Sequence, residues 1–73
     1  MEDVTYTKGL YTATATVRPA EDGQYRGVVT LARDEGDELE NTVYEVEATS
    51  TTGEEALEEA KALAHRILGE IEF

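Results

Sequence analysis

The chain has 73 residues, of which 17 are acidic, 6 are basic and none is Cys, and its formal net charge is −11. This length suits a single domain, 1–73, with one modest core, and the lack of Cys excludes a disulfide scaffold, a thiolate zinc site and a cysteine nucleophile. The acidic balance excludes nucleic acids and anionic membranes as partners, because Lys and Arg are needed to neutralise phosphates. Since no apolar run has the length of a membrane span or a signal peptide, we expect a soluble, cytoplasmic protein.

Residues 1–9 allow two interpretations. Val4 and Tyr6 alternate with polar residues, and Lys8-Gly9 can serve as a two-residue turn that folds this segment back onto the next strand as a short extra strand. An irregular lead-in with a glycine bulge fits the same residues.

Three strands are predicted over 10–18, 24–33 and 41–50, because apolar and polar residues alternate there with a period of two. Pro19 and the Asp22-Gly23 pair separate the first two strands, since Pro cannot donate to a ladder and Asp-Gly favours a turn. The acidic residues between 34 and 40, with a Gly among them, predict a charged loop.

The register of these strands follows from keeping the apolar side chains on one face. We expect Ala15 opposite Gly27 in the first hairpin, and Val29 opposite Val46 in the second. The result is an antiparallel meander in the order 1-2-3, with one apolar face and one wet face.

A helix is predicted over 53–69. Thr52 and Glu55 have the spacing of a capping box, in which each side chain satisfies a backbone N–H of the other residue. Gly69 is expected to end the helix. One helical face is apolar and consists of Ala56, Ala60, Leu63, Ala64, Ile67 and Ile71.

The helix is expected to pack closely on the sheet, because small residues occupy the apolar strand positions Ala13, Ala15, Gly27 and Ala48. The predicted fold class is therefore α+β, a three-stranded antiparallel meander with one C-terminal helix packed on one face.

Catalytic, cofactor-binding and metal-binding residues are not predicted, and we do not expect an enzyme. His65 is the only His and Ser50 the only Ser, so a triad has no candidates. The acidic run 34–38 does not have the spacing of a calcium-binding EF-hand loop, and we interpret it as a solvated hairpin tip.

The net charge is confined to one segment. Residues 34–60 contain eleven acids and no base, whereas the rest of the chain contains six acids and all six bases. This segment covers the predicted second loop, the third strand and the first half of the helix.

The junction between the third strand and the helix resembles a known family. Residues 48–56, Ala-Thr-Ser-Thr-Thr-Gly-Glu-Glu-Ala, are similar to the region of HicB-type antitoxins in which a three-stranded meander leads into a capped helix. The run Tyr25–Val29 after an Asp-Gly turn is similar to the second strand of that family. The likeness spans about residues 10–70, and it implies a small domain that neutralises a basic partner protein.

Two functions are compatible with these observations. The first is a small acidic protein-binding module that engages a basic partner protein, since opposite charge steers association. The second is a stand-alone domain, natural or designed, with no specific ligand. For the first function the predicted partner-binding residues are Glu38, Glu40, Glu45, Glu47, Glu54 and Glu58.

An exposed edge strand also offers a contact for a homodimer, because its unpaired backbone groups accept a further strand. Glu45 and Glu47 discourage self-pairing of the third predicted strand. We therefore expect the first predicted strand, 10–18, to be the dimer edge.

The stand-alone function leads to a prediction about salt. If the acidic surface is an adaptation to high salt, molar salt should raise the melting temperature strongly, because screening weakens repulsion between carboxylates. Thermal unfolding followed by circular dichroism at increasing salt measures this. A melting temperature that does not respond to salt would instead favour a binding partner.

Overall fold

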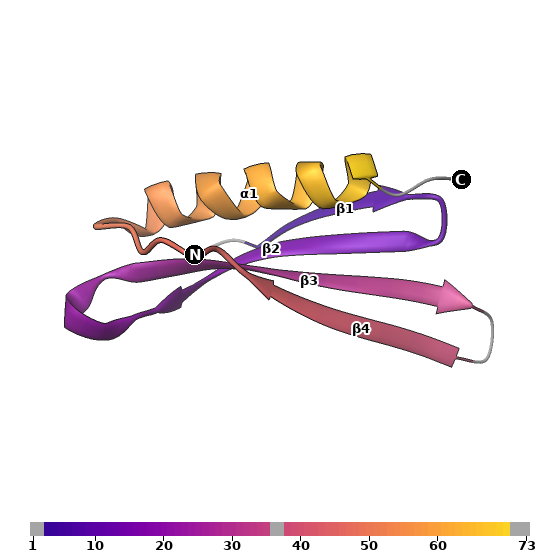
Figure 1. Cartoon of the computed structure of the whole chain (residues 1–73), viewed down its shortest axis with the longest axis horizontal. Helices are drawn as coiled ribbons and strands as arrows, with labels where there is room; N and C mark the ends of the chain where they lie inside the picture. The colour runs from indigo at the N-terminus through magenta and orange to yellow at the C-terminus, as the bar shows by residue number, and fades with distance from the viewer. Residues whose placement is uncertain (1–2, 36–37, 71–73) are drawn as a thin grey trace.

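The computed structural model describes the backbone of residues 3–35 and 38–70 and the side chains of residues 3–34 and 40–70 (Figure 1). Its elements are β1 (Val4–Lys8), β2 (Tyr11–Pro19), a short 3-10 turn η1 (Glu21–Gly23), β3 (Tyr25–Glu35), β4 (Glu38–Glu45) and α1 (Gly53–Glu70).

The α+β class with one C-terminal helix is confirmed, but the expected sheet of three strands is wrong. The sheet has four antiparallel strands in the order β1-β2-β3-β4 (Figure 1). Residues 4–8 form β1, which pairs with β2 from Val4 opposite Ala15 to Lys8 opposite Tyr11. Of the two interpretations of 1–9, the structure has the strand, with the turn at Gly9-Leu10.

The added strand changes which strands form the edges. The predicted strand 10–18 corresponds to β2, which pairs with β1 on one side and β3 on the other. It is therefore an interior strand, and the expectation that it forms a dimer edge is wrong. The edges of the described sheet are β1 and β4.

The predicted charged loop 34–40 is mostly strand. β3 continues to Glu35 and β4 starts at Glu38, so the hairpin extends the ladder through a segment rich in acids. Asp34 and Glu40 are exposed here, so their carboxylates stay in water while their backbone groups pair. The loop interpretation fails because acidic side chains oppose burial and not extended backbone. The tip, 36–37, lies outside the described residues.

The observed register differs from the expected one by two residues. Ala15 lies opposite Val29, and Val29 lies opposite Tyr44. A shift of two residues leaves every side chain of the ladder on its predicted face, so the composition of the apolar face is the same in the expected and the observed register. In the first hairpin the register goes with a compact connection between β2 and β3, closed by a hydrogen bond of 2.8 Å from the Ala20 N–H to the Gln24 carbonyl.

The predicted strand 41–50 ends early, at Glu45. Val46 still donates to the Gly27 carbonyl at 2.9 Å, and Ser50 then forms two backbone hydrogen bonds of 2.8 Å with Tyr25. The two residue steps from Gly27 to Tyr25 in β3 thus lie opposite four steps from Val46 to Ser50, and the chain leaves the regular ladder after the Val46 N–H. Ala48 is exposed as a result, so its predicted place under the helix is wrong.

The core lies between α1 and one face of the sheet and is built largely from small residues. Its fully buried members are Ala13, Ala15, Val29, Ala60, Ala64 and Leu68. The opposite face carries a Thr stripe from β2 and β3, with Val28 as a buried exception at 1% exposure.

Thr52 caps the start of α1 as predicted, because the Glu55 N–H donates to Thr52 Oγ1 at 3.1 Å, which is one of the two bonds of the expected capping box. The helix then continues through Gly69 to Glu70, so the predicted stop at Gly69 is wrong. Ile71, assigned to the apolar helical face, lies outside the described residues.

The helix crosses the sheet diagonally. Its first turns contact β3, where a Cβ added to Gly27 would lie 2.5 Å from the Ala56 carbonyl oxygen and 3.0 Å from the Ala60 Cβ. Its last turn reaches β1, where Lys8 Nζ donates to the Leu68 carbonyl at 2.9 Å. This path covers β1, β2 and β3, and β4 lies farthest from the helix (Figure 1).

We predict that Gly27→Ala destabilises the protein by about 1–3 kcal/mol, because the new methyl group overlaps helix backbone in a packed core. The matched control is Gly69→Ala, since a Cβ added there meets nothing within 4 Å. Because Gly69 lies in the last turn of α1, that change should stabilise by less than the value of about 1 kcal/mol that holds in a helix interior. Urea unfolding followed by circular dichroism measures both, and equal effects would contradict the close approach at Gly27.

Candidate functional site

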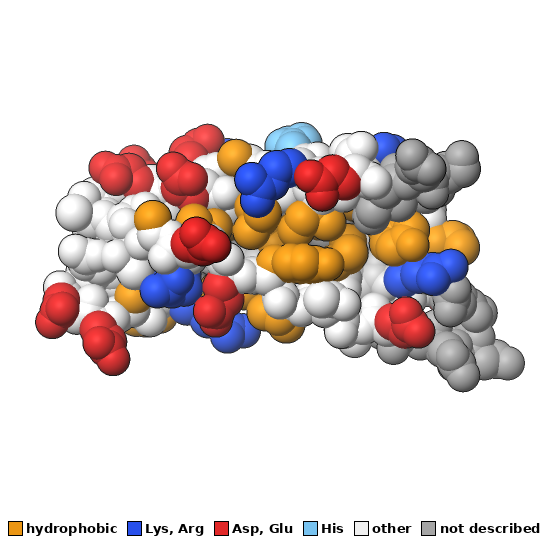
Figure 2. Space-filling view, viewed as in Figure 1, with side chains coloured by type: hydrophobic (Ala, Val, Ile, Leu, Met, Phe, Trp, Pro, Cys, Tyr) orange, Lys and Arg blue, Asp and Glu red, His pale blue; other side chains and the backbone are white. Residues whose placement is uncertain are grey.

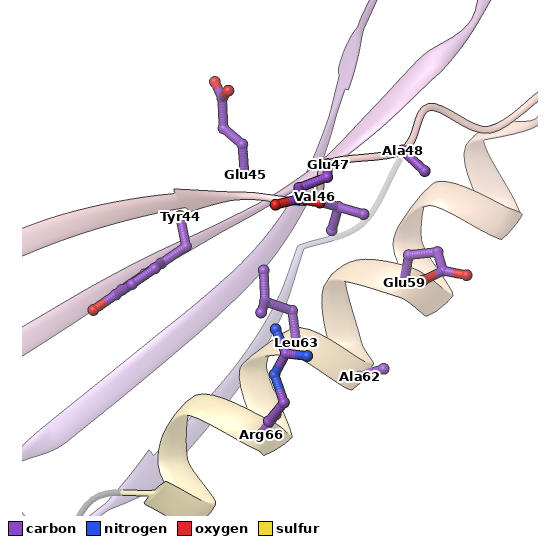
Figure 3. A pocket seen from close by; sticks show the side chains of 9 residues that line it. All are labelled: Tyr44, Glu45, Val46, Glu47, Ala48, Glu59, Ala62, Leu63 and Arg66. Atoms are coloured by element: carbon purple, nitrogen blue, oxygen red, sulfur yellow. The ribbon is translucent and has the colours of Figure 1, made fainter.

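One hollow of the described surface is an open groove of about 570 Å³ between α1 and the end of β4. We call it the α1/β4 groove. In Figure 2, orange side chains gather in the middle of the face, between the line of α1 and that of β4, with red and blue side chains around them. The lining residues are Tyr44, Glu45, Val46, Glu47, Ala48, Glu59, Ala62, Leu63 and Arg66 (Figure 3).

The groove exists because the sheet is wider than the helix that covers it. Val4, Ala15, Val29 and Tyr44 form one cross-strand row on the helix side of the sheet. Ala15 and Val29 are fully buried under α1, whereas Tyr44 is 38% exposed. Tyr44 thus extends the core row beyond the helix, and its ring faces the side on which Leu63 lies (Figure 3).

One end of the groove is formed by the irregular segment 46–48, and Arg26 holds this segment in place. Arg26 Nη1 donates to the Val46 carbonyl at 2.6 Å and to the Glu47 carbonyl at 3.1 Å. These charge-assisted bonds satisfy carbonyl groups that have left the sheet ladder. The guanidinium therefore substitutes for the missing strand pairing.

The charge of the groove is predominantly negative. Three carboxylates, from Glu45, Glu47 and Glu59, and one guanidinium, from Arg66, belong to its lining. The Glu45 carboxylate points away from the helix, so it borders the groove from the other side of β4 (Figure 3). An apolar floor with an acidic border suits a ligand that has both apolar and basic groups.

The structure does not gather the six predicted partner-binding glutamates in one place. Glu45 and Glu47 lie at the groove, and Glu40 is exposed on the helix side of β4, in register with Arg33. The side chain of Glu38 lies outside the described part of the chain.

The remaining two predicted glutamates, Glu54 and Glu58, belong to a second, shallower hollow of about 440 Å³ on the first two turns of α1. Glu58 also forms an ion pair with Lys61 at 3.0 Å. The hydrogen bond and the charge of Glu58 raise the pKa of Lys61 above its ordinary value. Glu59 lines both hollows, so Glu54 and Glu58 lie next to the α1/β4 groove but are not part of its lining.

Sequence reasoning missed Tyr44, Leu63, Glu59 and Arg66 as members of a site. The period of two in the predicted strand 41–50 places Tyr44 on its apolar side, and the helical period places Leu63 on the apolar helical face; both agree with the structure. The sequence contains one indication of this part of the site. Ala62 and Arg66 are four residues apart, so they lie on one side of the helix, beside its apolar face. What the sequence does not show is that the helix stops short of β4.

The structure offers little for catalysis or metal binding. His65 is exposed and its ring packs on Tyr6, with ring centroids 4.3 Å apart. The backbone of Ser50 forms an isolated antiparallel bridge with Tyr25. Within residues 3–35 and 38–70, no group of three or more His, Cys, Asp or Glu side chains is placed to hold a metal ion.

Comparison with protein-family models, with curated proteins and with solved structures finds no match to this chain. In the part of the chain that the structure describes, no helix combines the length and the apolar composition of a membrane-crossing segment.

We predict that Arg26→Met destabilises the protein by about 1–3 kcal/mol, because two carbonyl groups lose a charged donor. It should also speed amide hydrogen exchange in residues 46–49. The matched control is Arg18→Met, which removes the same charge at the exposed position opposite Arg26. Equal losses in urea unfolding, or unchanged exchange, would show that Arg26 does not hold this segment.

Proposed function

We propose that this protein is a small acidic protein-binding module that takes a basic partner protein at the α1/β4 groove. The observation that carries the proposal is the groove itself, in which exposed Tyr44 and partly buried Leu63 are bordered by the carboxylates of Glu45, Glu47 and Glu59. Exposed aromatic side chains within a hollow are typical anchors of protein interfaces.

The charge of the chain supports a basic partner. The formal net charge of −11 comes from residues 34–60, which include β4, the segment that ends the groove and the first turns of α1. Such a field raises the association rate of a basic protein more than it raises affinity. Glu54 and Glu58 contribute to this field from a distance, whereas Glu45 and Glu47 are placed for contact.

The resemblance to HicB-type antitoxins, carried by residues 25–29 and 48–56, supports the same kind of partner, since it implies neutralisation of a basic protein. A cytoplasmic location remains part of this proposal. The edge formed by β1 leaves room for a homodimer as well.

We predict that the double variant Glu45→Lys/Glu47→Lys loses the basic proteins that the wild-type chain retains from a cell extract at low salt. The amount of retained protein should fall about tenfold or more. The two substitutions replace negative charges at the groove with positive ones, so a basic protein is repelled both on approach and in contact. The measurement is quantitative mass spectrometry of proteins retained by immobilised chain.

The control variant is Glu21→Lys/Glu70→Lys. It makes the same change in net charge at two exposed residues that do not line the groove. It should keep most of the retained proteins. An identical set of retained proteins in both variants would contradict a binding site at the groove.

A further inference from the structure

We propose that the partner binds as an extended basic segment that adds a fifth strand along the outer edge of β4, with alternate apolar side chains entering the α1/β4 groove. This inference rests on the proposed function and deepens it by naming the form of the partner. It combines three observations on β4, namely a free backbone edge, an uncovered apolar side and an excess of glutamate.

The free edge follows from the hydrogen-bond pattern of the β3/β4 ladder. The Val46 N–H donates to the Gly27 carbonyl, so the backbone N–H of Val46 faces β3 at the end of the ladder. Because residues that face the neighbouring strand alternate with residues that face away in an antiparallel ladder, Tyr44 directs its N–H and C=O toward β3. Asn41 and Val43 then direct theirs outward, where no described strand lies beside β4. An incoming strand finds these groups ready to pair.

The groove provides side-chain recognition on one face of such a strand. The side chains of an added strand alternate between the two faces of the sheet, as those of β4 do. On the helix side they meet Tyr44 and, across the groove, Ala62 and Leu63. This side suits a branched apolar residue such as Val, Ile or Leu.

The other face of the added strand meets different groups. Val43 is 55% exposed there, and Glu45 points the same way, because both have the parity opposite to Tyr44. A Lys or Arg on this face can place its stem on Val43 and its charge beside Glu45. The pattern that fits the edge is therefore alternation of apolar and basic residues.

The same glutamates argue against a second copy of this chain as the occupant. Residues 38–47 contain four glutamates and no basic residue. β4 itself contains three of these glutamates, so pairing β4 with β4 of another copy would place six carboxylates along one seam, and like charges across a strand pair are destabilising. Charge complementarity thus selects a basic segment.

The test uses the full chain and a fluorescent peptide of the length of β4 in which Lys and Val alternate. The matched peptide has the same composition with its Lys and Val residues in two blocks, so it has equal charge but no apolar side. We expect the alternating peptide to bind about tenfold more tightly in fluorescence anisotropy.

The variant Val43→Pro removes one outward N–H and leaves the ladder with β3 intact, as Pro is tolerated on edge strands. It should weaken binding of the alternating peptide about tenfold. Val43→Thr keeps the N–H and one of the two methyl groups of the contact with the Lys stem, so it should weaken binding much less than Val43→Pro does. Methylating alternate backbone nitrogens of the peptide should weaken binding similarly. That last measurement needs no change in the protein and holds even if the Pro variant misfolds.

The contrary outcomes separate this inference from the proposed function. Equal binding of the two peptides, both reduced by Glu45→Lys/Glu47→Lys, would overturn strand addition and leave the acidic binding module standing. If neither peptide binds while basic proteins are still retained, strand addition is again wrong; if basic proteins are not retained either, both proposals are wrong. A chain that sediments as a dimer and becomes a monomer on Val43→Pro would assign the edge to a second copy, contrary to our inference.

Discussion

The close contact between α1 and the middle strands is the constraint on which the rest of this structure depends. Ala13 and Ala15 on β2 and Gly27 on β3 present almost no side-chain volume, and Ala60 and Ala64 present little from the helix. Backbones can therefore approach so closely that a methyl group at Gly27 has no space. An 8.0 kDa chain has few large apolar side chains to bury. Its core is therefore filled by the close approach of helix and strand backbones and not by large side chains.

That contact also determines where the helix leaves the sheet uncovered. The helix is held at its start against Gly27 and at its end by Lys8 of β1, so it runs away from β4. Sheets twist, and a single helix on a twisted four-stranded sheet cannot follow every strand. The row that begins at Val4 and is buried at Ala15 and Val29 ends in the exposed ring of Tyr44. The α1/β4 groove is thus a consequence of core packing.

The departure of residues 46–49 from the ladder has a similar origin. The chain must turn from β4 to the start of α1, and the Tyr25–Ser50 bridge sets where that turn begins. Two extra residues are accommodated between Val46 and Ser50, and Arg26 satisfies the carbonyl groups that lose their strand partners. Glu47 is brought to the groove by this irregularity. The acidic border is therefore positioned by a structural arginine on the opposite side of the sheet from the core.

The sequence by itself determined the elements that depend on local pattern: a capped helix from Gly53, strands with a period of two, the side of the sheet on which the residues of the ladder lie, and a net charge of −11 confined to 34–60. It did not determine the register, because a shift of two residues preserves every apolar face, nor the pairing of residues 4–8, which alternate too briefly to decide between strand and lead-in. Glu45 and Glu47 were identified as binding candidates from charge, whereas Tyr44 and Leu63 were assigned only to the core. Only the tertiary structure decided that β2 is interior, that β4 is an uncovered edge and that Tyr44 faces a groove, because these depend on how far one helix reaches across four strands.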